Sequence, residues 1–233
     1  MREAILAHGS RVVRVSVEQG DSPRLEALVR FATDHSVAEV TREPRGLLDA
    51  LTEGTVHQGV VAWGPELELA AFADLVAEPT LLGMVLDGIS DPQNFGAVVR
   101  SAVGIAGAAV VWGEHASAPL SLATFRASAG AVEHARLCRV PSLATALSDA
   151  RAAGVQVVGL EPQADRALRE IDLSGPTLLV LGSEGEGMSR SVRRSLSCSA
   201  RLAQSGRIGS LNASVAAAIA LYEASNQRAK SVS

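Results

Sequence analysis

The stretch GRIGSLNASVAAAIALY, at residues 206–222, decides how the C-terminal part of this 233-residue chain folds. It joins a glycine-rich loop to an alanine-rich helix through Ser210, Leu211 and Asn212. Glycine lets a backbone approach a ligand closely, and alanine favours a tightly packed helix. Ser210 or Asn212 can cap this helix, and a helix N-terminus suits a polar or anionic group. Many helices begin in this way, so the meaning of the stretch depends on two segments upstream.

The first upstream segment is LDGISDPQNFGAVVRSA, at residues 86–102. It predicts a strand end, a turn that starts at Asp91, and a helix for which Asn94 is a natural N-cap. Arg100 stands in the same helix, which is otherwise lined by alanine and valine. A lone arginine there is either a surface side chain that extends past apolar neighbours or a functional cation.

The second upstream segment is VLGSEGEGMS, at residues 180–189, where an apolar strand runs into a glycine-rich loop. The glycines free backbone groups to face a ligand, although a simple tight turn is the alternative. Glu184 and Glu186 argue against a bound phosphate, because they would repel it. They suit a sulfonium, an ammonium group or ribose hydroxyls. The spacing fits neither a P-loop nor a dinucleotide fingerprint.

Composition predicts a globular protein with a core of small aliphatic side chains. Hydrophobic residues make up 47% of the chain and aromatic residues only 3%. The apolar runs are too short to cross a bilayer, and the N-terminus does not resemble a signal peptide. Cys138 and Cys198 lack the paired spacing of a metal or disulfide framework. We therefore expect a cytoplasmic protein with two packing thiols, no bound metal and no membrane partner.

Charge is unevenly distributed along the chain, whose formal net charge is −4. Residues 1–73 hold 7 arginines against 11 acidic residues, and the remainder is nearly neutral. One stretch without acids is basic, which predicts either a solvated helix face or a surface for RNA phosphates. Its members are Arg190, Arg193, Arg194, Arg201 and Arg207.

The apolar pattern predicts two domains: a small α/β unit at 1–73 and a larger α/β domain at 81–228. A linker at 74–80 joins them, and a polar tail at 229–233 ends the chain. In the first unit we expect strands at 12–17, 37–41 and 56–62 and helices at 23–34 and 44–51. In the larger domain we expect strands at 82–86, 108–112, 137–140, 155–160 and 177–181. Helices are expected at 94–105 and 142–153 in this domain, and such alternation predicts a mostly parallel sheet covered on both faces. A further helix is expected at 67–76, in the stretch that joins the two domains.

Taken together, the three segments resemble the three sequence motifs of the SpoU/TrmH family, ribose 2′-O-methyltransferases of the SPOUT superfamily. The resemblance covers roughly 81–227 and includes DxxxDPxNxGAxxR, LGSEGxGM and SLNxSVAxAIxLYE, in that order. Residues 1–73 resemble, more weakly, the small RNA-binding module of the ribosomal-RNA members, most clearly at 56–62. His57 in that stretch is expected to be structural or to face RNA rather than to be catalytic.

The resemblance implies a homodimer with a trefoil-knotted domain that binds S-adenosylmethionine in the knot. The knot loops would contain 182–188 and 202–211, with cofactor contacts made mostly through the backbone. These contacts are expected from Gly182, Glu184, Gly187, Leu202, Gln204, Ile208 and Leu211. The chain departs from the family where Ile-Pro-Met is usual and Leu202-Ala203-Gln204 stands instead. Loss of the proline frees one backbone angle and adds an N–H donor, which could loosen the adenine pocket.

The resemblance also implies a catalytic set of Asn94, Arg100, Glu184, Ser210 and Asn212. The nucleophile would be a ribose 2′-hydroxyl, which is too weakly acidic to ionise freely, so a base or a strong cation should help. The family proposal gives that task to Arg100 with the RNA phosphate. Because arginine stays protonated in proteins, we favour Arg100 as a clamp on the phosphate and a stabiliser of the alkoxide, with the base unresolved.

The remaining members of the set are expected to position groups. Asn94 would hold Arg100 or the ribose, and Glu184 would orient Asn94 or Arg100 by a charged hydrogen bond. Ser210 and Asn212 would position the substrate nucleotide or lock the loop. Simple helix capping is the alternative for Asn94 and Asn212.

The sequence therefore predicts methylation of a ribose 2′-hydroxyl in RNA with S-adenosylmethionine, at a guanosine of 23S ribosomal RNA. The alternatives are a transfer-RNA ribose methyltransferase and a non-catalytic RNA-binding protein with the same fold. A nucleotide-dependent oxidoreductase fits poorly, because no GxGxxG turn follows the first strand. The expected partners are RNA and a second copy of the chain.

Overall fold

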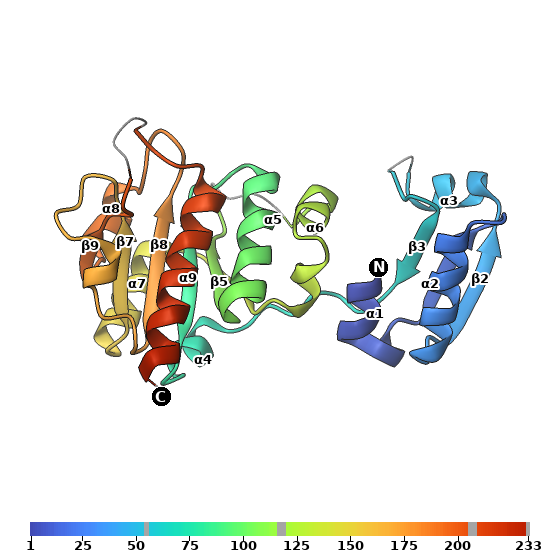
Figure 1. Ribbon diagram of the computed structural model, residues 1–233, viewed down its shortest axis with the longest axis horizontal. Helices are drawn as coiled ribbons and strands as arrows, with labels where there is room; N and C mark the ends of the chain where they lie inside the picture. Colours follow the sequence, from blue (N-terminus) through green and yellow to red (C-terminus); the bar gives the residue numbers. More distant parts are fainter. Residues whose placement is uncertain (54–55, 116–119, 205–208, 232–233) are drawn as a thin grey trace. The chain divides into compact units, whose positions relative to one another are not determined.

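The computed structural model describes residues 1–53, 56–115, 120–204 and 209–231 (Figure 1). The chain forms two compact units, Met1–Leu67 and Glu68–Ser233. The domain bounds given above, including the linker at 74–80, stay a prediction. No helix in the described ranges is both long and apolar enough to cross a membrane.

The N-terminal unit is a three-stranded sheet with helices packed against it. Its elements are α1 (Arg2–His8), β1 (Arg14–Glu18), α2 (Pro23–Asp34), β2 (Glu39–Glu43), α3 (Arg45–Leu51) and β3 (Val60–Trp63). Strand β1 lies in the centre, parallel to β2 and antiparallel to β3. Val15 and Val17 point from β1 into a core that also contains Ile5 and Ala32. The alternation along β1 therefore separates this core from the polar face of the sheet.

His57 holds the turn before β3 in place. Its Nδ1 accepts a hydrogen bond from the Gly59 N–H at 3.0 Å, and its Nε2 lies 2.9 Å from Asp49 Oδ1. The proton of a neutral ring therefore lies on Nε2, which donates to Asp49. The side chain is almost fully buried, at 4% exposure. These contacts give His57 a structural role within its own unit.

The C-terminal unit is a six-stranded sheet of order β6-β5-β4-β8-β7-β9, in which every pairing between described strands is parallel. Its strands are β4 (Leu82–Asp87), β5 (Ala109–Gly113), β6 (Leu137–Val140), β7 (Gln156–Leu160), β8 (Thr177–Gly182) and β9 (Cys198–Ala200). The central strands β4, β5 and β8 are buried almost throughout, as expected of a sheet covered on both faces. The predicted α/β fold with a mostly parallel sheet is confirmed.

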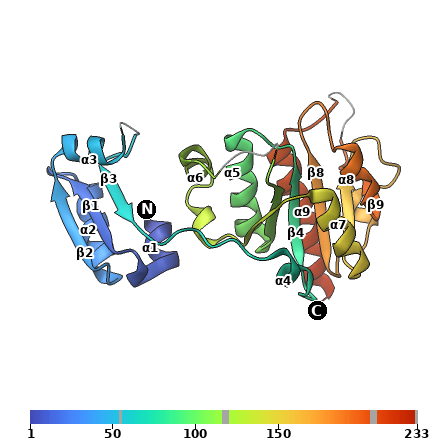
Figure 2. The ribbon, with the colours of Figure 1, turned by 180° about the vertical axis from the view of Figure 1, so that it is seen from behind.

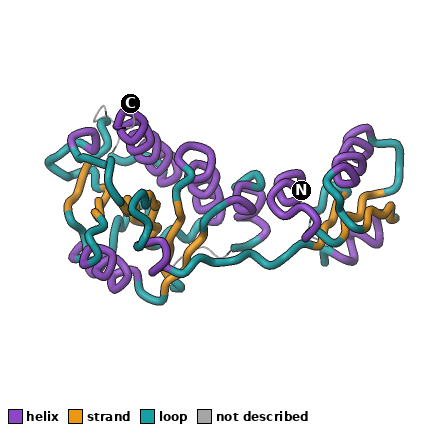
Figure 3. The backbone as a smooth tube through the Cα atoms, turned by 90° about the horizontal axis from the view of Figure 1, so that it is seen from below, coloured by secondary structure: helices purple, strands orange, loops and turns teal. Residues whose placement is uncertain are grey.

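Helices cover both faces of this sheet (Figures 1 and 3). They are α4 (Phe72–Val76), α5 (Pro92–Ser101), α6 (Leu122–Ala127), α7 (Leu143–Ala152), α8 (Arg190–Arg194) and α9 (Ala213–Ser231). Helices α5 and α9 lie side by side on one face, whereas α4, α7 and α8 pack on a core that includes Val85, Val111 and Val157 (Figure 2). Gly96 lets α5 approach α6, since a Cβ there would lie 2.5 Å from Ala127 Cβ.

Two predicted helices have different bounds in the structure. The expected N-cap of the helix at 94–105 was wrong: Asp91 caps α5, with its carboxylate accepting from the N–H groups of Gln93 and Asn94. Pro92 then occupies the first turn, where its missing N–H costs nothing. The helix expected at 67–76 is only α4, because Leu69 forms a parallel bridge with Leu137 and Ala70 N donates to Leu137 O.

The guanidinium of Arg228 anchors the C-terminal end of α9 to the sheet. It donates to the carbonyl oxygens of Leu173, Thr80, Leu81 and Gly175 at 2.5–3.0 Å. Burial lowers the pKa of Arg228, but four carbonyl acceptors compensate for the missing water. This end of α9 is thereby fixed at the start of β4 and β8, while its other end lies at the candidate site.

Candidate active site

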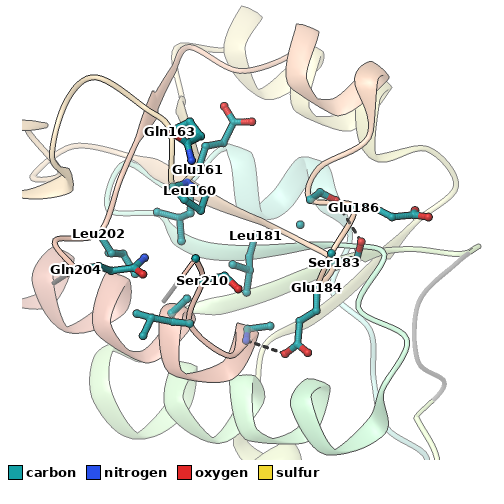
Figure 4. A pocket seen from close by; sticks show the side chains of 18 of the residues that line it. Leu160, Glu161, Gln163, Leu181, Ser183, Glu184, Glu186, Leu202, Gln204 and Ser210 are labelled. Carbon is teal, nitrogen blue, oxygen red and sulfur yellow. Dashed lines mark hydrogen bonds between the residues drawn. The ribbon is translucent and has the colours of Figure 1, made fainter. Parts of the chain in front are cut away.

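Glu184 belongs to the motif in the loop after β8, and its carboxylate binds residues of the two other sequence motifs. Its Oε1 accepts hydrogen bonds from Asn94 Nδ2 at 3.2 Å and from Asn212 Nδ2 at 3.0 Å. The backbone N–H of Ala213 donates to the same oxygen at 3.1 Å (Figure 4). Asn212 Nδ2 also lies 2.9 Å from Asn94 Oδ1. Side chains 118 residues apart in sequence therefore form one polar cluster at the carboxyl end of β8.

Asn212 is also the cap of α9. Its Oδ1 accepts from the N–H groups of Ser214 at 3.0 Å and Val215 at 3.3 Å. The capping contacts and the contact with Glu184 use different atoms of the same amide. Asn212 therefore fixes the start of the helix and, at the same time, presents its Nδ2 to the cluster.

The loop after β8 is a tight turn, and the glycine that leads into it has no room for a side chain. The backbone groups of Ser183 and Gly187 exchange two hydrogen bonds, at 3.1 and 3.0 Å. A Cβ at Gly182 would lie 2.2 Å from Gly187 C and Met188 N, which no side chain can tolerate. Gly187 has φ +71°, a left-handed conformation that favours glycine. The turn brings Glu184 over the cluster and leaves the backbone bare toward the adjacent cavity.

A cavity of about 410 Å³ lies between the carboxyl ends of β7 and β8 and the segment before α9 (Figure 4). Leu160, Leu181, Leu202 and Leu211 give it apolar walls. Its polar and acidic lining comes mainly from Glu161, Gln163, Ser183, Glu184, Glu186, Arg193, Gln204 and Ser210. A crevice at the carboxyl ends of parallel strands is where α/β folds bind ligands.

The structure gathers most of the predicted site residues at this cavity. Of the expected cofactor contacts, all except Ile208 line it: Gly182, Glu184, Gly187, Leu202, Gln204 and Leu211. Ile208 lies outside the described residues. Of the expected catalytic set, Glu184 and Ser210 line the cavity, and Asn94 and Asn212 are bound to Glu184.

Arg100 stands apart from the cavity in its own chain. It lies on the exposed face of α5 and is not among the lining residues. Within the described part of the chain it makes no hydrogen bond or salt bridge. Glu184 therefore contacts Asn94 and not Arg100, which leaves the guanidinium open to a group from outside this chain.

The predicted basic stretch separates into residues with different partners. Arg193 Nε lies 2.8 Å from Glu161 Oε1, and Arg201 donates to the Ala164 carbonyl at 2.8 Å. Arg190 and Arg194 are exposed on α8 without a carboxylate partner in the described ranges. Arg207 lies outside those ranges. Of the described arginines in this stretch, Arg190 and Arg194 therefore form a solvated basic face.

Glu161 and Arg193 are cavity residues that were not expected from the sequence. Glu161 follows β7, and its position at a strand end was the one available signal. Arg193 was grouped with its basic neighbours. Of the described lining residues, three are carboxylates, and Arg193 is the one cation. This acidic lining, beside a glycine backbone that leaves no room for a Cβ, fits a ligand with net positive charge such as S-adenosylmethionine.

Comparison with known proteins gives two family matches. Residues 82–222 match the model of the SpoU rRNA Methylase family, and residues 3–69 match that of RNA 2′-O ribose methyltransferase substrate binding. The first match spans all three sequence motifs, which contain the residues of the polar cluster.

Individual relatives extend over nearly the whole chain. The 23S rRNA (guanosine-2′-O-)-methyltransferase RlmB of Pseudomonas syringae pv. tomato is 38% identical over 235 residues, covering 97% of this chain and 92% of the relative. An uncharacterized tRNA/rRNA methyltransferase of Mycolicibacterium vanbaalenii is also 38% identical, over 92% of this chain and 69% of its own length. The crystal structure of the SpoU methyltransferase AviRb from Streptomyces viridochromogenes, in complex with the cofactor AdoMet, superposes with a TM-score of 0.78. The two share 26% identity, over 97% of this chain and 87% of that one.

Proposed function

This chain belongs to the SpoU rRNA methylase family, and from that membership we propose that it methylates a ribose 2′-hydroxyl of 23S ribosomal RNA, at a guanosine, with S-adenosylmethionine as methyl donor. The main structural support for this proposal is the contact of Glu184 Oε1 with both Asn94 and Asn212 at the edge of the cavity. Two amides held by one carboxylate form a fixed set of donors and acceptors for a polar substrate. The N-terminal unit, which matches a substrate-binding family, is proposed to hold the RNA.

The cavity residues suit the cofactor without side-chain crowding. Gly182 and Gly187 offer bare backbone, and Leu202 and Leu211 offer apolar walls for a flat ring. Gln204 stands where the family usually has methionine, and its amide can form hydrogen bonds with the edge of the adenine ring. Bound S-adenosylmethionine supplies a methyl group on a sulfonium, which the carboxylates of the lining stabilise.

On the substrate side, the residues position the ribose and its phosphate. Asn94, held by Glu184, presents its amide to the ribose or to Arg100. Arg100 clamps the RNA phosphate and stabilises negative charge on the 2′-oxygen. Ser210 lines the cavity and positions the nucleotide. The identity of the base stays open, because no histidine stands in the three motifs.

We also propose that the protein is a cytoplasmic homodimer with a trefoil knot built from the loops at 182–188 and 202–211. Helix α9 supports the dimer, since Val215, Ile219 and Tyr222 recur on one side of it and are 47%, 44% and 61% exposed. Arg100, exposed on the neighbouring α5, would then act at the cavity of the partner subunit. In such a dimer, Arg100 would have to lie away from the cavity of its own chain, as it does.

Methyl transfer to defined RNAs tests the proposal. The purified protein is incubated with methyl-labelled S-adenosylmethionine and with unmodified transcripts of 23S ribosomal RNA or transfer RNA. We expect label on the 23S transcript. Label on transfer RNA alone would identify a transfer-RNA enzyme instead. If calorimetry detects no binding at millimolar cofactor, the protein is a non-catalytic RNA-binding member of the fold.

A further inference from the structure

Arg193 occupies a special position among the groups that line the cavity. It is the one cation of the described lining, which also holds the carboxylates of Glu161, Glu184 and Glu186. A cavity with excess negative charge attracts the sulfonium and the ammonium of the expected cofactor. The same charge repels the carboxylate at the end of the cofactor's methionyl chain, which a cation beside it would stabilise.

Glu161 holds the guanidinium of Arg193 in place. Arg193 Nε lies 2.8 Å from Glu161 Oε1, and the second oxygen, Oε2, accepts from Ser199 Oγ at 2.7 Å. Glu161 is three-quarters buried, at 24% side-chain exposure, while Arg193 is half exposed at 50%. The carboxylate is thus fixed from both sides by β9 and α8. It orients the arginine without enclosing it.

The pair leaves most of the guanidinium donors available. An arginine carries five N–H donors, and the ion pair with Glu161 lies at the Nε side of the guanidinium. The two Nη groups have no hydrogen-bond partner within the described residues. Nη2 is directed at Gly187, where a Cβ would lie only 3.3 Å away. Because Gly187 has no side chain, the Nη edge stays open beside the loop that forms the cavity wall.

From this geometry we infer that Arg193, oriented by Glu161, binds the carboxylate of the methionyl chain of S-adenosylmethionine. The planar guanidinium matches a carboxylate with two parallel hydrogen bonds. The inference rests on the proposed function, because it names the contact that one end of that cofactor makes. Glu161 is a positioning residue in this scheme, since it acts through Arg193.

Two ligands that differ at the amino-acid end test the inference. S-adenosylhomocysteine carries the amino-acid chain, whereas 5′-methylthioadenosine has the same nucleoside and sulfur but no carboxylate. Both are titrated by calorimetry into the wild-type protein and into Arg193→Ala. Loss of charge-assisted hydrogen bonds should weaken S-adenosylhomocysteine binding about 10- to 100-fold. Binding of 5′-methylthioadenosine should change less than about twofold, because it never reaches Arg193.

Further variants separate this role from its alternatives. Arg190→Ala, an exposed arginine of the same helix that does not line the cavity, is the matched control and should bind both ligands as the wild type does. Glu161→Gln should weaken S-adenosylhomocysteine selectively, by a smaller factor. Equal weakening of both ligands in Arg193→Ala, with a lower melting temperature, would show a structural ion pair and overturn the inference.

Two other outcomes are distinct. Unchanged binding of both ligands, with weaker RNA binding, would reassign Arg193 to an RNA phosphate and also overturn the inference. If the wild type binds neither ligand, the proposed function itself fails, because the cavity then takes no adenosyl compound.

Discussion

At the scale of single residues, the site depends on carboxylates that each connect several groups. Glu184 connects the starts of α5 and α9, and Glu161 connects β9 and α8. The sequence predicted Asn94, Glu184 and Asn212 because they stand in motifs of a known order. It could not predict Glu161, since nothing in the sequence indicates that its partners Arg193 and Ser199 lie beside it. Asp91 replaced Asn94 as the cap, which leaves the Asn94 amide free for Glu184.

Arg100 provides a test at this scale. Replacement by alanine should abolish methyl transfer and leave cofactor affinity within about twofold, because the proposed partner of Arg100 is the RNA phosphate and not the cofactor. The fold should be unaffected, since the side chain is exposed and alanine favours helix. Single-turnover transfer and calorimetry measure the two effects. Loss of cofactor binding together with an unfolded dimer would instead make Arg100 structural.

At the scale of elements, the apolar pattern predicted the long strands and helices and missed short ones. The ranges 23–34 and 137–140 coincide with α2 (Pro23–Asp34) and β6 (Leu137–Val140). Strand β9 has three residues and is held by pairing with β7, so it has no periodicity of its own. Helices α1 and α6 are short and were likewise not predicted.

The loop after β8 is the element most sensitive to a single methyl group. Gly182→Ala should lower the free energy of unfolding by about 3 kcal/mol or more, because its Cβ would overlap backbone atoms of Gly187 and Met188. Cofactor binding should disappear with the turn. Gly104→Ala is the control, since a Cβ there meets nothing within 4 Å and Gly104 does not line the cavity. Denaturant unfolding and calorimetry would refute the prediction if the two variants behaved alike.

Helix α8 offers a test of RNA binding by exposed cations. If Arg190 and Arg194 bind phosphates, the double alanine variant should bind RNA with a flatter dependence on salt. The slope of log K against log salt should fall in magnitude by about 1.4, which is about 0.7 for each phosphate that is no longer neutralised. Filter binding over a range of salt concentrations measures it. An unchanged slope would return both residues to a solvated helix face.

At the scale of the whole molecule, the order of the elements predicted a parallel sheet covered on both faces, and this is confirmed. Periodicity reports local structure, so it predicts neither how loops thread nor how two chains meet. The knot and the dimer were expected from family resemblance alone. The exposed apolar residues of α9 add an independent reason to propose a dimer.

The dimer can be tested through this helix. A charge on the apolar side of α9, in Ile219→Glu with Tyr222→Glu, should convert the dimer to a monomer, because a buried unpaired carboxylate is costly. Sedimentation equilibrium should then report half the wild-type mass. Leu6→Glu, at an exposed apolar residue of the N-terminal unit, should leave the mass unchanged. A wild-type protein that sediments as a monomer would contradict the proposal.

We propose that the cavity and the Asn94–Glu184–Asn212 cluster together serve ribose methylation. The most direct measurement is mass spectrometry of nucleosides from 23S ribosomal RNA, after incubation of the protein with methyl-labelled S-adenosylmethionine. We expect the label to appear in 2′-O-methylguanosine. Label on a base, or no label from a protein that binds the cofactor, would contradict it.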